Sequence, residues 1–510
     1  MQASGATDTT LVKRSRADVL PPPDVVFEYD CSIPLEIFAH ICTFLKYGDV
    51  VAFVSTCKYL RRLMREKYLA LPIFVCGTYP MPPQINPRML DLSIKWSVPG
   101  IQAFFDAYAP VIYRMKVSAM TAIPDLPPMP NLLVLKIVGQ NITRLPVAPE
   151  LYQCIASYSA VIDISALADC RDLRVLDLTG TPVMDITPLA NCHSLKDLNL
   201  PISCIPTLAA IKSLPQLRQL SISRSDSDDT IAIPDLPKSL ETLCIDNPII
   251  NCKNLAGLVN LQVLQISSND ESLSLTFVKL MAGLKTLYIR NATVADLNGL
   301  ASCPALSRLQ LFAVAPDVDV SMLTACLQLT YVDIMCIGPQ DIAFRLANLR
   351  TFKTYSAPGS SISGIRYSPR IVLLDICRSW ITHLPAGTWS ANLRTLNIAD
   401  TLVADITGLI APRLRGLNIA NTQIADIAAI TGCPKLQKID ISATYVADIQ
   451  PMLFCANLTH IAAAQCKSIR VAAVVLQLPR LHMVNFTECK IANAAGLAAA
   501  LTARGVDAKF

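Results

Sequence analysis

A repeat of about 22 residues restricts the fold of this chain more than any other feature. The pattern LxxLxI, then Thr, then Val or Ile, then Asp-Ile, is clearest in the four segments that begin at Leu173, Leu393, Leu414 and Leu436. Its first Leu or Ile recurs along the chain at Ile112, Leu132, Leu151, Leu173, Leu195, Leu217, Leu240, Leu261, Leu284, Leu306, Leu329, Leu349, Ile371, Leu393, Leu414, Leu436, Leu458 and Leu481. This regularity predicts one extended repeat array rather than a set of separate globular domains.

Each copy combines a strand with a return segment. In LxxLxI the last two apolar residues are two apart, as on one face of a strand, and the later apolar positions bring the chain back to the same core. An Asp that suits the N-terminal cap of a short helical turn recurs at Asp163, Asp185, Asp296, Asp405, Asp426 and Asp448. Such a row can also bind a cation, but one Asp per repeat supplies only one ligand per layer.

Cysteines follow the same repeat. Cys170, Cys192, Cys303, Cys433 and Cys455 occupy one equivalent position, shortly before the next strand. We expect them to be small, buried, unpaired side chains, and many free thiols favour a reducing compartment. The sequence has no CxxC pair or Cys/His spacing typical of zinc, so no metal or other cofactor is expected.

Two further segments modify the array. The string AIPDLP, in residues 122–137 and 232–245, forbids a regular helix and predicts an extended return segment. The last residues, ANAAGLAAALTARGVDAKF, predict a closing helix and a short final strand. Such a cap shields the end layer of a repeat array.

The repeats resemble the leucine-rich-repeat family, over roughly residues 110–510. The resemblance implies an α/β solenoid of horseshoe form, with a parallel strand ladder on its concave face. We assign residues 111–510 to this solenoid and its C-terminal cap. Residues 71–110 are expected to be a linker with an irregular first repeat around RMLDLSIKW.

Residues two, four and six after the first Leu should point outward from the concave strands. In the late repeats they are small or polar, as in Thr395 and Asn397. In the middle repeats they are large aromatic and cationic side chains of the kind that anchor interfaces, and we predict that a target protein binds there, at Tyr288, Arg290, Arg308, Phe312, Tyr331, Met335, Lys353 and Tyr355. Alternatively, these side chains pack on each other, or the register shifts near the irregular repeat at Leu349.

Residues 29–70 have a different pattern. Apolar residues at helical spacing, Pro34 in a first turn and a break at KYGD predict two or three short helices. The stretch IPLEIFAHICTFLKYGDVVAFVSTCKYLRRL resembles an F-box, although Ile33 replaces the usual Leu and Tyr59 a common Trp. The resemblance implies contact with a Skp-type adaptor through Pro34, Leu35, Ile37, Ile41, Leu45, Val50, Val51 and Val54. The structural alternative is a helical cap that seals the first repeat.

Together the two resemblances imply a non-catalytic substrate-recognition subunit of a Skp–cullin–F-box ubiquitin ligase. The net charge of +5 does not suggest nucleic-acid binding, and no uncharged apolar run is long enough to span a membrane. Residues 1–28 are expected to be a disordered tail without a secretory signal, with KRSR at 13–16 as a candidate nuclear address, so we expect a cytoplasmic or nuclear protein. The alternatives are a repeat scaffold or regulatory subunit outside any ligase, or a cell-surface adhesin, against which the absent signal and abundant thiols count.

Overall fold

The computed structural model describes most of the repeat region. It covers Phe105 and residues 109–119, 126–138, 142–212, 214–223, 231–250, 252–336, 343–355, 362–385 and 388–510, with the backbone alone at 71–76 and 90–96. The predicted tail and helical module, residues 1–70, lie outside this part. So do the predicted adaptor contacts Pro34, Leu35, Ile37, Ile41, Leu45, Val50, Val51 and Val54.

The chain divides into two compact units, residues 1–181 and 182–510. In the first unit, consecutive strands pair in parallel in chain order. They are β1 (Leu71–Cys76), β2 (Leu90–Trp96), β3 (Ile112–Ala119), β4 (Val134–Val138), β5 (Gln153–Ile155) and β6 (Val175–Asp177). Two strands therefore lie within 71–110, the second of them at RMLDLSIKW. The described 3-10 helices of this unit are η1 (Ala109–Val111) and η2 (Ser165–Asp169).

The second unit continues the same construction. Its parallel ladder runs through β7 (Asp197–Pro201), β8 (Gln219–Ser223), β10 (Thr242–Ile250), β11 (Val263–Ser267), β13 (Thr286–Asp296), β14 (Arg308–Val314), β15 (Tyr331–Cys336), β16 (Thr351–Tyr355), β17 (Leu373–Asp375), β18 (Thr395–Asn397), β19 (Gly416–Asn418), β20 (Lys438–Asp440), β21 (His460–Ala462), β22 (Met483–Asn485) and β23 (Asp507–Lys509). Two short strands, β9 (Ile231–Ala232) and β12 (Leu273–Ser274), pair with β10 and β13.

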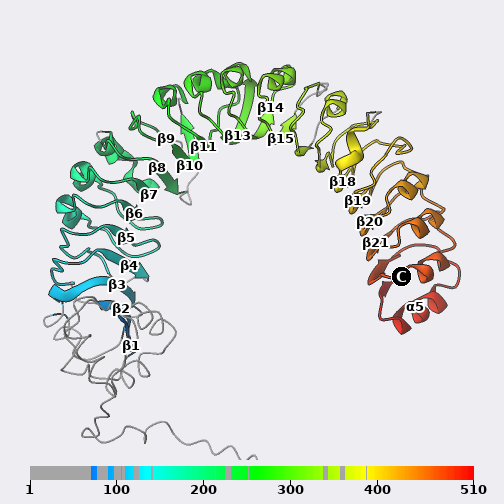
Figure 1. The fold of residues 1–510 in the computed structure, drawn as a ribbon, viewed down its shortest axis with the longest axis horizontal. Coiled ribbons are helices and arrows are strands. Elements are labelled where there is room, and N and C mark those ends of the chain that lie inside the picture. The colour runs from blue at the N-terminus through cyan, green and yellow to red at the C-terminus, as the bar shows by residue number, and fades with distance from the viewer. Residues whose placement is uncertain are drawn as a thin grey trace, which may run out of the picture. The chain divides into compact units, whose positions relative to one another are not determined.

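Strands and return segments lie on opposite sides of this second unit. In Figure 1 the strands line the inner side of its curve and the short helices lie on the outer side. These helices are η3 (Thr187–Asn191), η4 (Ile202–Ile211), η5 (Cys252–Gly257), η6 (Leu275–Leu280), η7 (Asn298–Ser302), η8 (Val320–Ala325), η9 (Ser363–Tyr367), η10 (Thr388–Asn392), η11 (Ala428–Gly432), η12 (Gln450–Phe454) and η13 (Ala473–Gln477). The predicted leucine-rich-repeat solenoid is confirmed for the described residues of each unit.

The leucine pattern produces the core because its apolar positions all face inward. In the layer that begins at Leu284, the side chains of Leu284, Leu287 and Ile289 are fully buried. Tyr288, which lies between the last two, is only partly buried. This alternation is the period-two pattern of a strand with one face against the core. Burial of each Leu or Ile contributes about 2 kcal/mol, and stacking repeats the contribution in every layer.

The recurring aspartates cap the return segments as predicted. In each case Oδ1 accepts a hydrogen bond, 2.7–3.0 Å long, from the backbone N–H two residues later. At Asp163, Asp185, Asp296, Asp426 and Asp448 that N–H belongs to the first residue of a 3-10 helix, and at Asp405 it begins a turn. The carboxylates therefore satisfy backbone donors that would otherwise have no partner at a helix start.

The predicted core cysteines are buried and are not joined in disulfides. Cys170, Cys192, Cys303, Cys433 and Cys455 are all in the core, and the thiol of Cys455 donates to the carbonyl oxygen of Ile430 at 3.4 Å. Burial raises the pKa of Cys433 to about 11, and burial with the neighbouring Cys433 raises the pKa of Cys455 to about 12. The thiols of Cys433 and Cys455 therefore remain neutral and act as small packing groups.

In nine repeats of the described structure, a left-handed residue lies seven positions after the first Leu or Ile, shortly after the strand or, at Asn291, within β13. Gly180 adopts it, and so do the non-glycine residues Tyr158, Asn291, Arg378, Asp400, Asn421, Ala443, Gln465 and Glu488, with φ between 53° and 63°. The next residue is often Thr, whose hydroxyl donates back to the carbonyl three residues earlier. Thr401 and Thr422 make this bond at 2.7 Å. The hydroxyl thus closes the turn and explains the Thr of the repeat pattern.

The C-terminal cap has the two predicted elements. Helix α5 (Ala494–Ala503) begins after Asn493, whose Oδ1 accepts from the N–H of Gly496 at 3.3 Å. Strand β23 pairs with β22 and extends the ladder. In the second AIPDLP string, β9 ends at Ala232 and residues 233–237 form no helix, as the prolines predict. Among the described residues, the helices are too short or too polar to cross a bilayer.

Candidate protein-binding face

The predicted target-binding residues share one face of the ladder. Tyr288 pairs with Gln310, Gln310 with Asp333 and Asp333 with Lys353, so these four side chains form one row across β13–β16. Arg308 pairs with Tyr331, and Met335 with Tyr355. The pairing of β15 with β16 is continuous, so the register does not shift at the irregular repeat near Leu349. We call Tyr288, Arg290, Arg308, Phe312, Tyr331, Met335, Lys353 and Tyr355 the central ridge.

Side chains of the central ridge contact each other along and across the strands. The guanidinium carbon of Arg290 lies 4.6 Å from the ring centroid of Tyr288, and that of Arg308 lies 4.3 Å from the ring centroid of Tyr331. The Tyr331 hydroxyl donates to Oδ2 of Asp333 at 3.2 Å. The expectation that these side chains pack on one another is therefore also met. The contacts leave Phe312 with 54% of its surface exposed.

At one end of the central ridge, Arg290 lies close to a carboxylate of a neighbouring strand. Arg290 Nη1 lies 3.6 Å from Oδ1 of Asp246 on β10, and Gln265 Nε2 donates to the same oxygen at 3.0 Å. Nε of Arg290 is buried and has no hydrogen-bond partner within the described structure. Arg290 is thus held over Tyr288 on one side and toward Asp246 on the other, which fixes its orientation.

The two tyrosines at the other end are kept neutral. Burial, followed by the negative charge of Asp333, raises the pKa of Tyr331. Burial, followed by the charges of Asp333 and Asp375, raises the pKa of Tyr355 to about 12. Both hydroxyls therefore remain protonated at neutral pH. The proton of Tyr331 is already donated to Asp333, whereas the Tyr355 hydroxyl can donate a hydrogen bond to a partner.

A hollow adjoins the central ridge and was not predicted. It encloses about 470 Å³ over β16–β22 and its floor is made of small side chains such as Thr395, Gly416 and Ala462. Lys353 of the ridge forms one wall, and Lys438 and Met483 stand at the far side. The sequence does contain a signal for this hollow, which is the run of small residues at the outward positions of the late repeats. Small residues form a depression only where larger side chains lie next to them.

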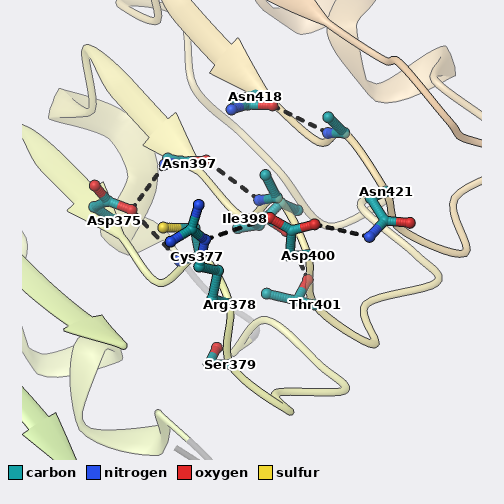
Figure 2. A network of polar contacts seen from close by, with 12 residues as sticks. Asp375, Cys377, Arg378, Ser379, Asn397, Ile398, Asp400, Thr401, Asn418 and Asn421 are labelled. Carbon is teal, nitrogen blue, oxygen red and sulfur yellow. Dashed lines mark hydrogen bonds and ion pairs between the residues drawn. The ribbon is translucent and has the colours of Figure 1, made fainter. Parts of the chain in front are cut away.

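Hydrogen bonds hold polar side chains in the hollow and in the turns that follow its strands. Asn397 Nδ2 donates to Oδ1 of Asp375 at 2.9 Å, and Asn397 Oδ1 accepts from the N–H of Ala399 at 3.2 Å. In the turns after β18 and β19, Asn421 Nδ2 donates to Oδ1 of Asp400 at 2.7 Å. Figure 2 shows these bonds running from Asp375 across Asn397 and, along the turns, through Asp400 to Asn421. The Asp375 and Asn397 side chains in the hollow are therefore oriented by hydrogen bonds.

The hollow presents side chains of both charges. It combines cations (Lys353, Lys438) with carboxylates (Asp375, Asp440). Within the described ranges, no group of three or more His, Cys, Asp or Glu residues could hold a metal ion. An aromatic and cationic ridge beside a preformed hollow is typical of a surface that binds a protein or peptide.

Comparisons with known proteins bear on the fold alone. No protein-family model matches the chain, and no curated protein sequence matches it. Among solved structures, a leucine-rich-repeat protein from Leptospira interrogans is 14% identical, with 82% of this chain and 100% of that chain covered and a TM-score of 0.49. An internalin from Listeria monocytogenes is 19% identical, with 70% and 86% covered and a TM-score of 0.39. A plant receptor-kinase ectodomain from Arabidopsis thaliana is 14% identical, with 80% and 56% covered and a TM-score of 0.48. The assignment of the leucine-rich-repeat fold rests on the chain's own leucine pattern and strand register.

Proposed function

We propose that the central ridge and the adjoining hollow bind a protein partner. The observation that carries this proposal is Phe312, a large aromatic side chain that is 54% exposed at the middle of an otherwise well-packed ridge. Exposed aromatic groups flanked by Arg are the residues that most often dominate binding energies. The neighbouring hollow, of about 470 Å³, offers space for a side chain of the partner.

We further propose that the chain delivers this partner to a ubiquitin ligase. The support is the F-box resemblance of residues 33–63, which implies docking of a Skp-type adaptor and, through it, of a cullin complex. On this proposal the chain is a non-catalytic recognition subunit in the cytoplasm or nucleus. The buried cysteines of the described repeats, which are not joined in disulfides, fit such a reducing compartment.

The alternative is a scaffold or regulatory subunit that binds proteins but joins no ligase. Binding on the central ridge is common to both functions, whereas the adaptor is specific to the ligase. Pull-down of the full chain, and of a chain lacking residues 31–70, separates them. The ligase function requires Skp and cullin with the full chain and their loss with the deletion. Absence of both from the full-chain sample, with partner proteins still captured, would favour the scaffold.

The central ridge is tested with the paired change Tyr288→Ala and Phe312→Ala. We expect capture of the partner to fall at least tenfold while adaptor binding is unchanged, because the adaptor residues lie in a different part of the sequence. Tyr445→Ala is the matched control, since Tyr445 is also exposed, at 64%, but lies outside the ridge. Equal partner capture by the double variant and the control would exclude the ridge as the binding site.

A further inference from the structure

A strongly basic edge lies where the strands of the second unit begin, away from the central ridge and the hollow. One depression of about 210 Å³ is lined by Arg394, Arg413, Arg415 and Lys435 alone. A second, of about 200 Å³, shares Arg394 and Arg413 with it and adds Arg350, Arg370, Val372 and Asn392. We call the six cations Arg350, Arg370, Arg394, Arg413, Arg415 and Lys435 the arginine edge.

The strand ladder places these like charges in neighbouring layers. The N–H of Arg415 donates to the carbonyl of Arg394 at 2.8 Å, and the N–H of Arg394 donates to the carbonyl of Val372 at the same distance. Neighbouring strands lie about 4.8 Å apart. Like charges on directly adjacent strands destabilise a sheet. A bound anion would therefore reduce the repulsion among the cations of the arginine edge.

Carboxylates do not neutralise the arginine edge within the described structure. All six side chains are exposed, and none of them forms an ion pair there. An earlier layer shows the contrast. Arg218 occupies the same repeat position as Arg394, and its Nη1 lies 3.4 Å from Oε1 of Glu241 in the next layer. Arg218 is therefore paired with a carboxylate, whereas Arg394 on the arginine edge forms no ion pair within the described structure.

Neutral asparagines hold two of the arginines in place. Arg413 Nη1 donates to Oδ1 of Asn392 at 2.8 Å, and Asn392 is itself fixed by a 2.9 Å bond from Nδ2 to the carbonyl of Pro369. Arg370 makes the same bond to Asn348 at 2.8 Å. The guanidinium groups are thus oriented without being neutralised, which lowers the entropic cost of binding an anion.

We propose that the arginine edge binds phosphoryl groups of a phosphorylated segment in a protein partner. A phosphoryl group carries a charge of about −1.5 to −2 and three acceptor oxygens, which match a depression ringed by four cations better than a single carboxylate does. Five of the six cations are Arg, whose planar fork binds phosphate oxygens in pairs. The two depressions together span five layers, about 19 Å at the ladder spacing, which fits a short peptide rather than a long nucleic acid.

The proposal goes beyond the partner site on the central ridge and does not depend on it. The test uses the full chain and a fluorescein-labelled heptapeptide, Gly-Ala-pSer-Ala-pSer-Ala-Gly, in fluorescence anisotropy. Its comparisons are the unphosphorylated peptide, the peptide with Asp in both positions, and a 15-nucleotide single-stranded RNA. We expect the phosphopeptide to bind at least tenfold more tightly than the other three, with an affinity that falls as salt rises.

Variants identify the site. Arg394→Gln with Arg413→Gln removes the two side chains that both depressions share, and we expect phosphopeptide affinity to fall at least tenfold. Arg415→Gln with Lys435→Gln, a second exposed pair, should lower it as well, whereas Arg218→Gln should not. Thermal unfolding verifies that each variant is folded.

Three results would overturn the proposal: equal affinity for the phosphopeptide and the Asp peptide, tighter binding of the RNA, or phosphopeptide binding that survives both double variants. The ridge variant Tyr288→Ala with Phe312→Ala should bind the phosphopeptide normally. A failure of the arginine edge and a failure of the central ridge are therefore distinguishable.

Discussion

The guanidinium of Arg308 stacks on the ring of Tyr331 on the neighbouring strand, with 4.3 Å between its central carbon and the ring centroid. An exposed cation–π pair of this kind contributes about 0.5–1 kcal/mol. The hydroxyl of the same tyrosine also donates a hydrogen bond to Asp333. Arg308 therefore helps to set the shape of the central ridge.

A double-mutant cycle measures this relationship. We expect Arg308→Ala and Tyr331→Phe to be nearly additive, because Phe keeps a ring under the guanidinium. Arg308→Ala and Tyr331→Leu should instead show a coupling energy of about 0.5 kcal/mol in chemical unfolding. Equal coupling in the two cycles would mean that the stacking contributes nothing to stability.

Thr354 is a buried polar residue without a partner. It occupies a core position on β16 that is Ile334 on β15, it is fully buried, and its hydroxyl has no hydrogen bond within the described structure. We expect Thr354→Val to raise the free energy of unfolding by about 1 kcal/mol, because it removes an unpaired hydroxyl with little change of shape. Thr401→Val is the matched control and should lower it by about 1 kcal/mol, because Thr401 donates to Ile398. Thermal unfolding of both variants gives the comparison, and a shift of the same sign in both would contradict the explanation.

Gly299 allows two return segments to approach closely. A Cβ at this residue of η7 would overlap the carbonyl oxygen of Leu275 and lie 2.8 Å from Cγ2 of Val278, both in η6. We expect Gly299→Ala to lower the free energy of unfolding by about 2–3 kcal/mol, as overpacking does. A Cβ at Gly432 of η11 would meet no atom within 4 Å, so Gly432→Ala should leave the unfolding midpoint almost unchanged. Similar midpoints for the two variants would show that the layers separate to accept the methyl group.

The carboxyl group of Asp319 makes the stability of the repeats depend on pH in the acid range. Its Oδ1 accepts from the N–H of Ser321 at 2.8 Å at the start of η8, and the bonds to Ser321 lower the pKa of the carboxyl below its usual value of 3.8. A lowered pKa in the folded state stabilises the fold at all pH values above the unfolded pKa, and this contribution is lost as pH falls through the folded pKa. Asn can accept the same bond but does not titrate. We therefore expect Asp319→Asn to match the parent near pH 7 and to lose less of its thermal stability below about pH 4. Parallel acid profiles for the two proteins would exclude a role for this carboxylate.

Much of the fold follows from the sequence because each repeat is a local structure. The spacing of Leu284, Leu287 and Ile289 fixes which side of a strand faces the core, and neighbouring copies repeat it. The Asp caps, the inward cysteines and the closing helix are likewise decided within one or two layers. These predictions were confirmed because they need only the strand period and short-range hydrogen bonds.

The surface features depend on relations between layers that one repeat does not contain. The hollow arises because small side chains at Thr395 and Gly416 lie between the larger Lys353 and Met483 several strands apart. The arginine edge depends on side chains before each strand, which the leucine pattern leaves free. In both cases the decisive quantity is the orientation of neighbouring side chains across the ladder, which the linear sequence does not state.

The left-handed residues that follow the strands lower the stability of the fold wherever they carry a side chain. The left-handed conformation costs a residue with a side chain about 1–2 kcal/mol, and it costs Asn and Asp less. Ala443 and Gln465 adopt this conformation. Gly180 occupies the equivalent position of an earlier repeat, so a glycine is compatible with this turn. The repeats therefore tolerate a small conformational penalty in layer after layer. For a protein engineer, Ala443 and Gln465 are two turn positions at which glycine could strengthen the array, and neither residue lines the hollow or the arginine edge.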